Sequence, residues 1–529
     1  MAPKSREVYL IEGDIVATHD SDKGDPRLYE KEYNYEDALD IIGFGKVHLA
    51  ALIICGLILM AVICETMGMM IIVIASRCDL SLEDYQKGLL TGVAFFGILI
   101  SSYFWGFFSD RYGRKSIILY STYASVFFSC ASVLTNNFWI FLILRLCSGI
   151  SISGPSAAIY AYLGEFNTMK NRQTTISWAS IFVGLANTFI PGMAWLILPQ
   201  TWSYSLYGDV TFRPWQLALI MYTFPGLLGA TLMIWMPETP KFLLSQNRER
   251  EAFKIVEWMY VKNTGRPAHT FIVQKLQPEG DKEYLESLNH KQGCGETMLS
   301  VWHQIAPLLR RPHIVNLLMC CVIQFGIFFA SAGLGLWLPE ILNRFNSITG
   351  DVFLTVCDVI DLTESAAIND NSTIKLVCDD SINPKVFMDS IMLGVSYVIG
   401  YAVLAIIINP VGRQIILPSV LLASGFSGVA LIWVAEPTAV VLLFCGFLML
   451  SGLCVSVVNG AIVDLIPTHM RGMAVCVQLS MGRLGSIVGS NIVGYSIYKD
   501  CLLTFSFYSG FLIFCGLLSI LLAKKPKPL

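Results

Sequence analysis

Long apolar runs separated by short polar segments dominate the chain. A helix needs about 20 apolar residues to cross the ~30 Å hydrocarbon core of a bilayer, and twelve runs approach or exceed that length. They cover residues 48–75, 86–108, 116–135, 138–163, 174–198 and 214–236, and then 313–342, 387–408, 415–435, 438–463, 473–497 and 502–523. The pattern predicts an all-α membrane protein with twelve transmembrane helices.

One polar signature occurs twice at a fixed offset. DRYGRK (residues 110–115) follows the second run and NPVGRQ (residues 409–414) follows the eighth, so the two motifs are 299 positions apart. Glu165 and Arg172 recur as Asp464 and Arg471 at the same offset. Landmarks repeated across two hydrophobic halves predict a duplicated fold of two six-helix pseudo-repeats.

The predicted runs divide the chain into five parts. These are an N-terminal tail (1–47), a first bundle (48–236), a linker with short amphipathic helices (237–312), a second bundle (313–523) and a C-terminal tail (524–529). Within the second bundle, residues 344–386 form a loop. The first 46 residues are polar and acidic, unlike a cleavable signal peptide, so the first run is expected to be an uncleaved anchor.

Composition supports this picture. The chain is 54% apolar and only 14% charged, with mean hydropathy +0.60, which excludes an ordinary soluble protein. Most Lys and Arg fall on the side shared by the two termini, so the positive-inside rule predicts a multi-pass protein with both termini in the cytosol. The loop 344–386 would then be lumenal or extracellular.

Cysteines on that opposite side are expected to form disulfides. Four are predicted there: Cys78, Cys357, Cys378 and Cys501. Cys357 and Cys378 share one loop and are the favoured pair, while Cys78 with Cys501 stays open because connectivity does not follow from sequence. Asn371 begins an N-glycosylation sequon in the same loop.

Several function classes lack their motifs. No GxxxxGK[ST] loop, no His/Cys metal-ligand spacing and no nucleophile–base constellation occurs in the chain. We therefore expect neither an enzyme nor an ATP-driven pump, with no cofactor, no metal and no nucleic-acid partner.

The DRYGRK region is typical of a gate at the cytosolic ends of helices. Asp110 is expected to pair with an arginine or a helix N-terminus, Gly113 to form the turn, and Gly106 to permit close helix packing. Glu165 with Arg172, and Asp464 with Arg471, would add salt bridges; the alternative is solvated helix-end charges. The predicted gate residues are Gly106, Asp110, Arg111, Gly113, Arg114, Arg145, Glu165, Arg172, Gly412, Arg413, Asp464 and Arg471.

These motifs resemble the major facilitator superfamily. PETPKFLL (residues 237–244) is similar to the PESPR signature of sugar porters and organic cation transporters, and RLCSG (145–149) matches the fourth-helix signature. Within the superfamily the chain is most similar to the synaptic vesicle glycoprotein 2 family. The segments that carry this likeness are YEDALD (35–40), GFGK (43–46), LS (80–81), QKG (86–88), VDLIPTHMR (463–471) and GRLG (482–485).

The likeness extends over residues 33–523 and implies a fold that works by alternating access. Two departures stand out. Val62 occupies the place of an aspartate in the first helix, where only Glu65 remains, and the large lumenal domain of the vesicle glycoproteins is reduced to residues 344–386. The resemblance also implies that Arg145 holds helices together more than it touches substrate.

Glu65 has two interpretations that do not exclude each other. A carboxylate inside the bilayer is costly unless it faces a polar cavity or a partner. It is either a protonatable or cation-binding group in the central cavity, or one half of an ion pair with Arg145 or Arg483.

Further polar side chains are candidates for the substrate cavity. Trp178 occupies a position where the resemblance implies a cavity-facing tryptophan, and Arg483 could attract an anionic substrate or pair with Glu65. Packing and hydrogen bonding between helices are the alternative for the amides. The predicted cavity residues are Glu65, Trp178, Gln324, Asn459, Gln478 and Arg483.

The sequence thus predicts a secondary active or facilitative transporter of a small polar organic solute, either sugar-like or an organic ion, with protons as a candidate coupling ion. A monomer in a synaptic or secretory vesicle or in the plasma membrane is expected. The alternative is a non-transporting vesicle membrane receptor or regulatory protein that keeps the transporter fold.

Overall fold

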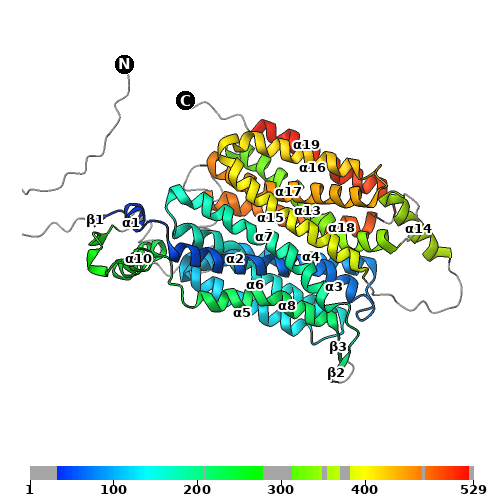
Figure 1. Cartoon of the computed structure of the whole chain (residues 1–529), viewed down its shortest axis with the longest axis horizontal. Coiled ribbons are helices and arrows are strands. Elements are labelled where there is room, and N and C mark those ends of the chain that lie inside the picture. The colour runs from blue at the N-terminus through cyan, green and yellow to red at the C-terminus, as the bar shows by residue number, and fades with distance from the viewer. Residues whose placement is uncertain are drawn as a thin grey trace, which may run out of the picture.

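The protein is a bundle of long helices in two groups. The computed structural model describes residues 32–207, 210–277, 313–347, 354–369, 382–466, 471–497 and 499–522. In Figure 1 the helices of the first group lie below those of the second, and the long axes of both groups run in the same direction. The predicted amphipathic linker is described as far as residue 277.

Twelve membrane-spanning helices occur in the described residues, as predicted. The first half holds α2 Lys46–Met67 with its continuation α3 Met69–Ala75, α4 Asp84–Tyr112, α5 Arg114–Ser132, α6 Phe138–Glu165, α7 Met169–Ile197 and α8 Pro214–Met233. The second half holds α13 His313–Ser347, α15 Pro384–Val411, α16 Arg413–Ala430, α17 Pro437–Leu465, α18 Arg471–Ser496 and α19 Cys501–Leu522. Ten spans are apolar enough to be recognised by hydropathy alone. The more polar α5 and α18, with 19 and 26 residues, complete the set.

The repeated signature has the same backbone in both halves. Gly113 ends α4 and precedes α5 with φ 99° and ψ 146°, and Gly412 ends α15 and precedes α16 with φ 86° and ψ 147°. Each donates its N–H to the carbonyl four residues earlier, Ser109 and Ile408, at 3.2 Å. Positive φ strongly favours glycine at both turns, which explains why Gly survives in the divergent second copy.

A small layer covers one end of the first half. It contains β1 Glu32–Tyr33, α1 Tyr35–Ile42, α9 Pro240–Ser245, α10 Glu249–Thr264, η1 Ala268–Thr270 and β4 Lys275–Leu276, with β1 and β4 paired in parallel. Helix α10 buries Ala252, Val256 and Met259, which recur at helical spacing. Tyr35 attaches the layer to the bundle by donating its hydroxyl to the Glu165 carbonyl at 2.7 Å. We call this end of the molecule the linker end.

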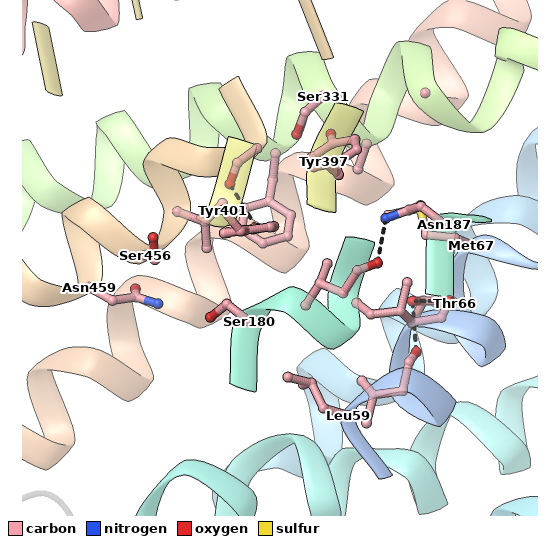
Figure 2. Close-up of a pocket in the computed structure, with 18 of the residues that line it drawn as sticks. Leu59, Thr66, Met67, Ser180, Asn187, Ser331, Tyr397, Tyr401, Ser456 and Asn459 are labelled. Carbon is pink, nitrogen blue, oxygen red and sulfur yellow. Dashed lines mark hydrogen bonds between the residues drawn. The ribbon is translucent and has the colours of Figure 1, made fainter. Parts of the chain in front are cut away.

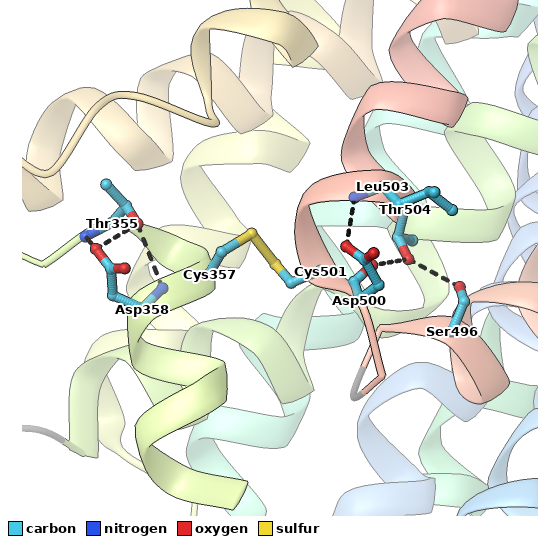
Figure 3. Close-up of a disulfide and its surroundings, with 8 residues drawn as sticks. All are labelled: Thr355, Cys357, Asp358, Ser496, Asp500, Cys501, Leu503 and Thr504. Atoms are coloured by element: carbon cyan, nitrogen blue, oxygen red, sulfur yellow. Dashed lines mark hydrogen bonds between the residues drawn. A yellow bond between two sulfur atoms is a disulfide. The ribbon is translucent and has the colours of Figure 1, made fainter.

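The opposite end carries a hairpin and a short helix. The antiparallel strands β2 Tyr204–Tyr207 and β3 Val210–Phe212 project beyond α7 and α8, while α14 Val356–Asn369 lies beside α13 and α19 (Figure 1). A disulfide joins Cys357 of α14 to Cys501 at the start of α19, with the two Cα atoms 5.4 Å apart (Figure 3). We call this the disulfide end.

The disulfide corrects the predicted connectivity. The pairing of Cys357 with Cys378 is wrong, because α14 packs on α13 and α19 and so brings Cys357 to Cys501. The alternative pairing of Cys78 with Cys501 is wrong for the same reason, and Cys78 belongs to another disulfide. Cys378 and Asn371 lie outside the described residues.

Loss of the Cys357–Cys501 bond should destabilise the fold. The bond closes a loop of 144 residues, and disulfides across long loops contribute about 2–4 kcal/mol. We expect Cys501→Ser to lower the melting temperature of the purified protein in detergent, and reducing agent to remove the difference from wild type. Cys130→Ser, at a free cysteine, is the control. A Cys501→Ser protein as stable as wild type under oxidising conditions would contradict this.

Candidate functional site

A cavity of about 400 Å³ lies between the two halves. Its wall is built by α2, α3, α6 and α7 of the first half and by α13, α15, α17 and α18 of the second. Figure 2 shows side chains from both halves around the opening, with Leu59, Thr66 and Ser180 on one side and Ser331, Tyr397 and Asn459 on the other. A wall shared in this way changes shape whenever the halves move relative to each other.

Arg483 is the one charged side chain among the described residues that line the cavity. It belongs to α18 but donates from Nη2 to Ser156 Oγ of α6 at 3.2 Å, so it crosses the boundary between the halves. Its guanidinium carbon lies 5.8 Å from the ring centre of Phe95 and 5.5 Å from that of Phe328. Two aromatic faces therefore flank the cation.

Six of the polar side chains around the cavity bond to backbone carbonyls. Tyr397 Oη donates to Leu448 O at 2.6 Å, and Asn187 Nδ2 donates to Val183 O at 2.9 Å. Thr66 Oγ1 donates to Val62 O at 2.9 Å. The rest of the wall is largely aliphatic or aromatic.

Three predicted amides form one cluster, and one of them reaches the cavity. Gln478 Nε2 donates to Gln324 Oε1 at 3.2 Å and to Asn459 Oδ1 at 3.0 Å. Gln324 and Gln478 are fully buried and do not line the cavity, whereas Asn459 does. The cluster therefore lies mostly behind the cavity wall, where it connects α13, α17 and α18.

Glu65 does not face the cavity. Its carboxylate forms an ion pair with Arg145 and accepts hydrogen bonds from Ser129 and Ser148, all inside the first half. Arg145 Nη1 also donates to Ser129 Oγ at 2.7 Å. The structure therefore supports the ion-pair interpretation and not the cavity-facing one, and Arg483 is not its partner.

Trp178 also lies outside the cavity, contrary to the prediction. Its side chain is 51% exposed and is not among the residues that line the cavity. Ser177 and Ser180 of the same helix line the cavity, so the helical rotation of about 100° per residue turns position 178 away. Sequence reasoning missed Tyr160, Tyr397 and Tyr401 as lining residues. The spacing of the last two by four positions, which puts both on one helix face, was the available signal.

At the linker end, charged residues form a cluster within the first half. Arg114 joins Glu165 at 2.7 Å and Asp110 at 3.2 Å. Glu238 of the PETP segment accepts the backbone N–H of Lys115 at 3.0 Å, which caps the start of α5. The PETP segment and the DRYGRK motif are therefore in direct contact.

Several predicted gate residues have other positions or partners. Glu165 and Arg172 do not pair with each other: Arg172 approaches Glu36 at 3.7 Å and donates to the Gly164 carbonyl. Arg145 is buried with Glu65, 20 residues or about 30 Å along α6 from Glu165. A Cβ at Gly106 would meet nothing within 4 Å, so no close helix contact occurs there.

The remaining predicted gate residues make equivalent contacts in the two halves only in part. Arg111 lies 6.0 Å from the ring centre of Tyr112. Arg413, the counterpart of Arg114, donates to the Gly460 carbonyl at 2.7 Å within the second half. The side chains of Asp464 and Arg471 are outside the described part of the structure.

At the disulfide end the two halves touch directly. Lys87 of α4 lies 3.6 Å from Glu340 of α13, and both side chains are buried. Glu340 also pairs with Arg344 at 3.2 Å. Close packing continues toward the middle, where a Cβ at Gly394 of α15 would lie 2.5 Å from the Thr188 nitrogen of α7. These contacts close the cavity toward the disulfide end.

Comparison with known proteins agrees with this architecture. Residues 51–356 match the family model described as Major Facilitator Superfamily. The chain is 26% identical over 361 residues to human synaptic vesicle glycoprotein 2B, covering 65% of this chain and 52% of that protein. It is 24% identical over 331 residues to mouse synaptic vesicle glycoprotein 2C, covering 60% and 46%. The chain thus spans about half the length of the curated relatives it matches.

Solved structures share the fold. The inward open conformation of the xylose transporter XylE from E. coli superposes with a TM-score of 0.61 at 13% identity, covering 91% of this chain and 97% of that one. A partially occluded inward open conformation of XylE gives 0.60 at 13% identity, covering 92% and 98%. At such identities the likeness concerns the fold alone.

Proposed function

Because the chain belongs to the Major Facilitator Superfamily, we propose that it is a secondary active or facilitative transporter that moves a small organic solute across a membrane by alternating access. The observation that carries the proposal is the cavity whose wall comes from both halves and which is closed at the disulfide end. A solute held there would be released on one side or the other as the halves tilt.

The proposed orientation puts the linker end in the cytosol. The helix termini at that end carry Arg111, Arg114, Lys115 and Arg413, in agreement with the positive-inside rule. The Cys357–Cys501 disulfide lies at the opposite end, where an oxidising compartment would maintain it. In this orientation the structure corresponds to a state closed to the lumen or the cell exterior.

The Lys87–Glu340 pair is the proposed lock of that state. Opening toward the disulfide end must separate α4 from α13 and so break the pair, whereas opening toward the linker end leaves it intact. Among the residues that the structure describes, the Arg114 cluster joins partners of the first half, so in our scheme it moves with that half as a unit.

Weakening this lock should shift the conformational equilibrium. Lys87→Glu would place two carboxylates together where they are shielded from water, and like charges in such a position repel strongly. We expect cysteines introduced at the disulfide end to react faster with a membrane-impermeant thiol reagent in Lys87→Glu than in wild type. Lys385→Glu, at an exposed lysine of the same end, is the control. Equal reactivity in the three proteins would contradict the assigned role of Lys87.

Uptake into proteoliposomes tests transport itself. Purified protein is reconstituted and offered radiolabelled glucose, choline and benzoate, with and without a pH gradient, beside protein-free liposomes. We expect saturable uptake of at least one solute, and a response to the gradient would distinguish coupled from facilitative transport.

The vesicle glycoprotein relatives favour a second candidate, a non-transporting membrane receptor or regulator that keeps the fold. Uptake no faster than in protein-free liposomes for every solute offered would support that candidate and contradict the transporter.

A further inference from the structure

Arg483, the single charge among the described residues of the cavity wall, points to the chemistry of the ligand. Resting on the transporter proposed above, we infer that the solute is an organic anion: one oxyanion group, such as a carboxylate, on a compact apolar or aromatic body. Arg483 would bind the oxyanion, and Asn459 would contact an acceptor elsewhere on the same molecule.

Arg483 lacks a counter-charge within the described part of the chain. Its hydrogen bond goes to the neutral Ser156, and no acidic residue appears among the described residues of the cavity wall. Arginine stays protonated in proteins, and an uncompensated charge at membrane depth is costly. A ligand carboxylate would supply the missing charge, and the planar guanidinium suits it because two parallel N–H bonds can form.

The rest of the wall suits an apolar body better than a sugar or a cation. Phe328 lines the cavity beside the guanidinium, and aliphatic side chains continue the surface. A sugar would bring many hydroxyls into a cavity where Tyr397 and Asn187 already donate to backbone carbonyls. Its unpaired hydroxyls would lose their water without compensation. An organic cation would meet Arg483 without an acidic partner among the described wall residues.

Asn459 supplies a second contact with a defined orientation. Its Oδ1 accepts from the fully buried Gln478, so its Nδ2 donor is directed to the other side of the amide, where the residue lines the cavity. Gln478 precedes Arg483 by five positions on α18, a separation of about 7.5 Å along the helix. In this proposal Asn459 is a specificity-determining residue and Gln478 a positioning residue, suited to a ligand that carries a second acceptor besides the oxyanion.

Three probes of equal size test the charge preference. Benzoate, benzyl alcohol and benzylamine differ mainly in charge, and each is titrated into the purified full chain while its melting temperature is recorded. We expect benzoate to raise the melting temperature in a saturable manner and the other two not to. Saturable stabilisation by benzylamine or benzyl alcohol, or none by benzoate, would overturn the inference.

Substitutions at Arg483 and Gln478 test the roles proposed for these residues in ligand binding. Arg483→Gln should weaken benzoate binding at least tenfold, because a charge-assisted hydrogen-bonded pair is lost, and Arg483→Lys should restore part of it. The unliganded Arg483→Gln protein should melt no lower than wild type, since it loses an uncompensated charge. A lower melting temperature would indicate a structural role and contradict the inference.

Gln478→Leu should weaken the binding of 4-acetylbenzoate, which carries a second acceptor across the ring, more than the binding of benzoate. An equal loss for the two ligands would contradict the role of Asn459 and Gln478.

The binding experiment and the uptake experiment can each fail without the other, and the two failures have different meanings. Stabilisation by benzoate without uptake would keep the anion site and contradict transport. Uptake of glucose or choline without stabilisation by benzoate would keep transport and contradict the anion site.

Discussion

Replacing Glu65 with leucine is expected to destabilise the first half severely. Arg145 would remain fully buried with its carboxylate partner gone, and breaking a buried ion pair from one side costs about 3–5 kcal/mol. The melting temperature of the purified protein should fall well below that of wild type. The double substitution Glu65→Leu/Arg145→Leu should recover much of the loss, because it removes both charges.

A milder variant separates this structural role from ion coupling. Glu65→Gln keeps the shape of the side chain and can still accept from Ser129 or Ser148, but it cannot ionise. If the pair is structural, melting temperature and uptake decline together. A Glu65→Gln protein with wild-type stability and uptake that no longer responds to a pH gradient would instead assign proton coupling to Glu65.

A large side chain placed where α7 packs against α15 is expected to reduce transport strongly. A Cβ at Gly184 would lie 2.6 Å from the backbone nitrogen of Val398, and backbone at that distance cannot yield as a flexible side chain would. Gly184→Leu should therefore hold the two halves apart at the level of the cavity. We expect the uptake rate to fall at least about tenfold.

Gly192→Leu is the matched control. Gly192 lies on the same helix, and a Cβ there would meet nothing within 4 Å. The control should transport at close to the wild-type rate. Full activity of Gly184→Leu would show that this contact does not form during the cycle, while equal loss in both variants would indicate a general effect of leucine in α7.

The sequence predicted those features that depend on local chemistry and repetition. Apolar runs indicated all twelve spans, although α5 and α18 are more polar than the other ten. The shared offset identified Gly113 and Gly412, whose φ and ψ agree in the two halves. The helical spacing of apolar residues likewise indicated an amphipathic helix in the linker, where α10 lies. The length of each apolar run, the turn at each glycine and the periodicity of α10 are each set by residues that are close together in the sequence.

The errors concern positions that depend on packing between distant segments. Trp178 belongs to the right helix, but the rotation of that helix is set by its neighbours. The sequence contains several arginines that could form an ion pair with Glu65. Which one does so depends on the packing of α2, α5 and α6, which brings Arg145 to it. Cys357 joins Cys501 because α14 lies beside α19, a contact between segments 144 residues apart.

The distances between spin labels at both ends test most directly whether the halves tilt around the cavity. One pair, Glu83→Cys and Lys385→Cys, spans the halves at the disulfide end, and a second, Met169→Cys and Ile415→Cys, spans them at the linker end; all four positions are exposed. Each pair is studied with and without Lys87→Glu, in a background where the exposed Cys476 is serine. We predict that Lys87→Glu lengthens the first distance and shortens the second. Two distances that stay unchanged, or that lengthen together, would contradict alternating access by this chain.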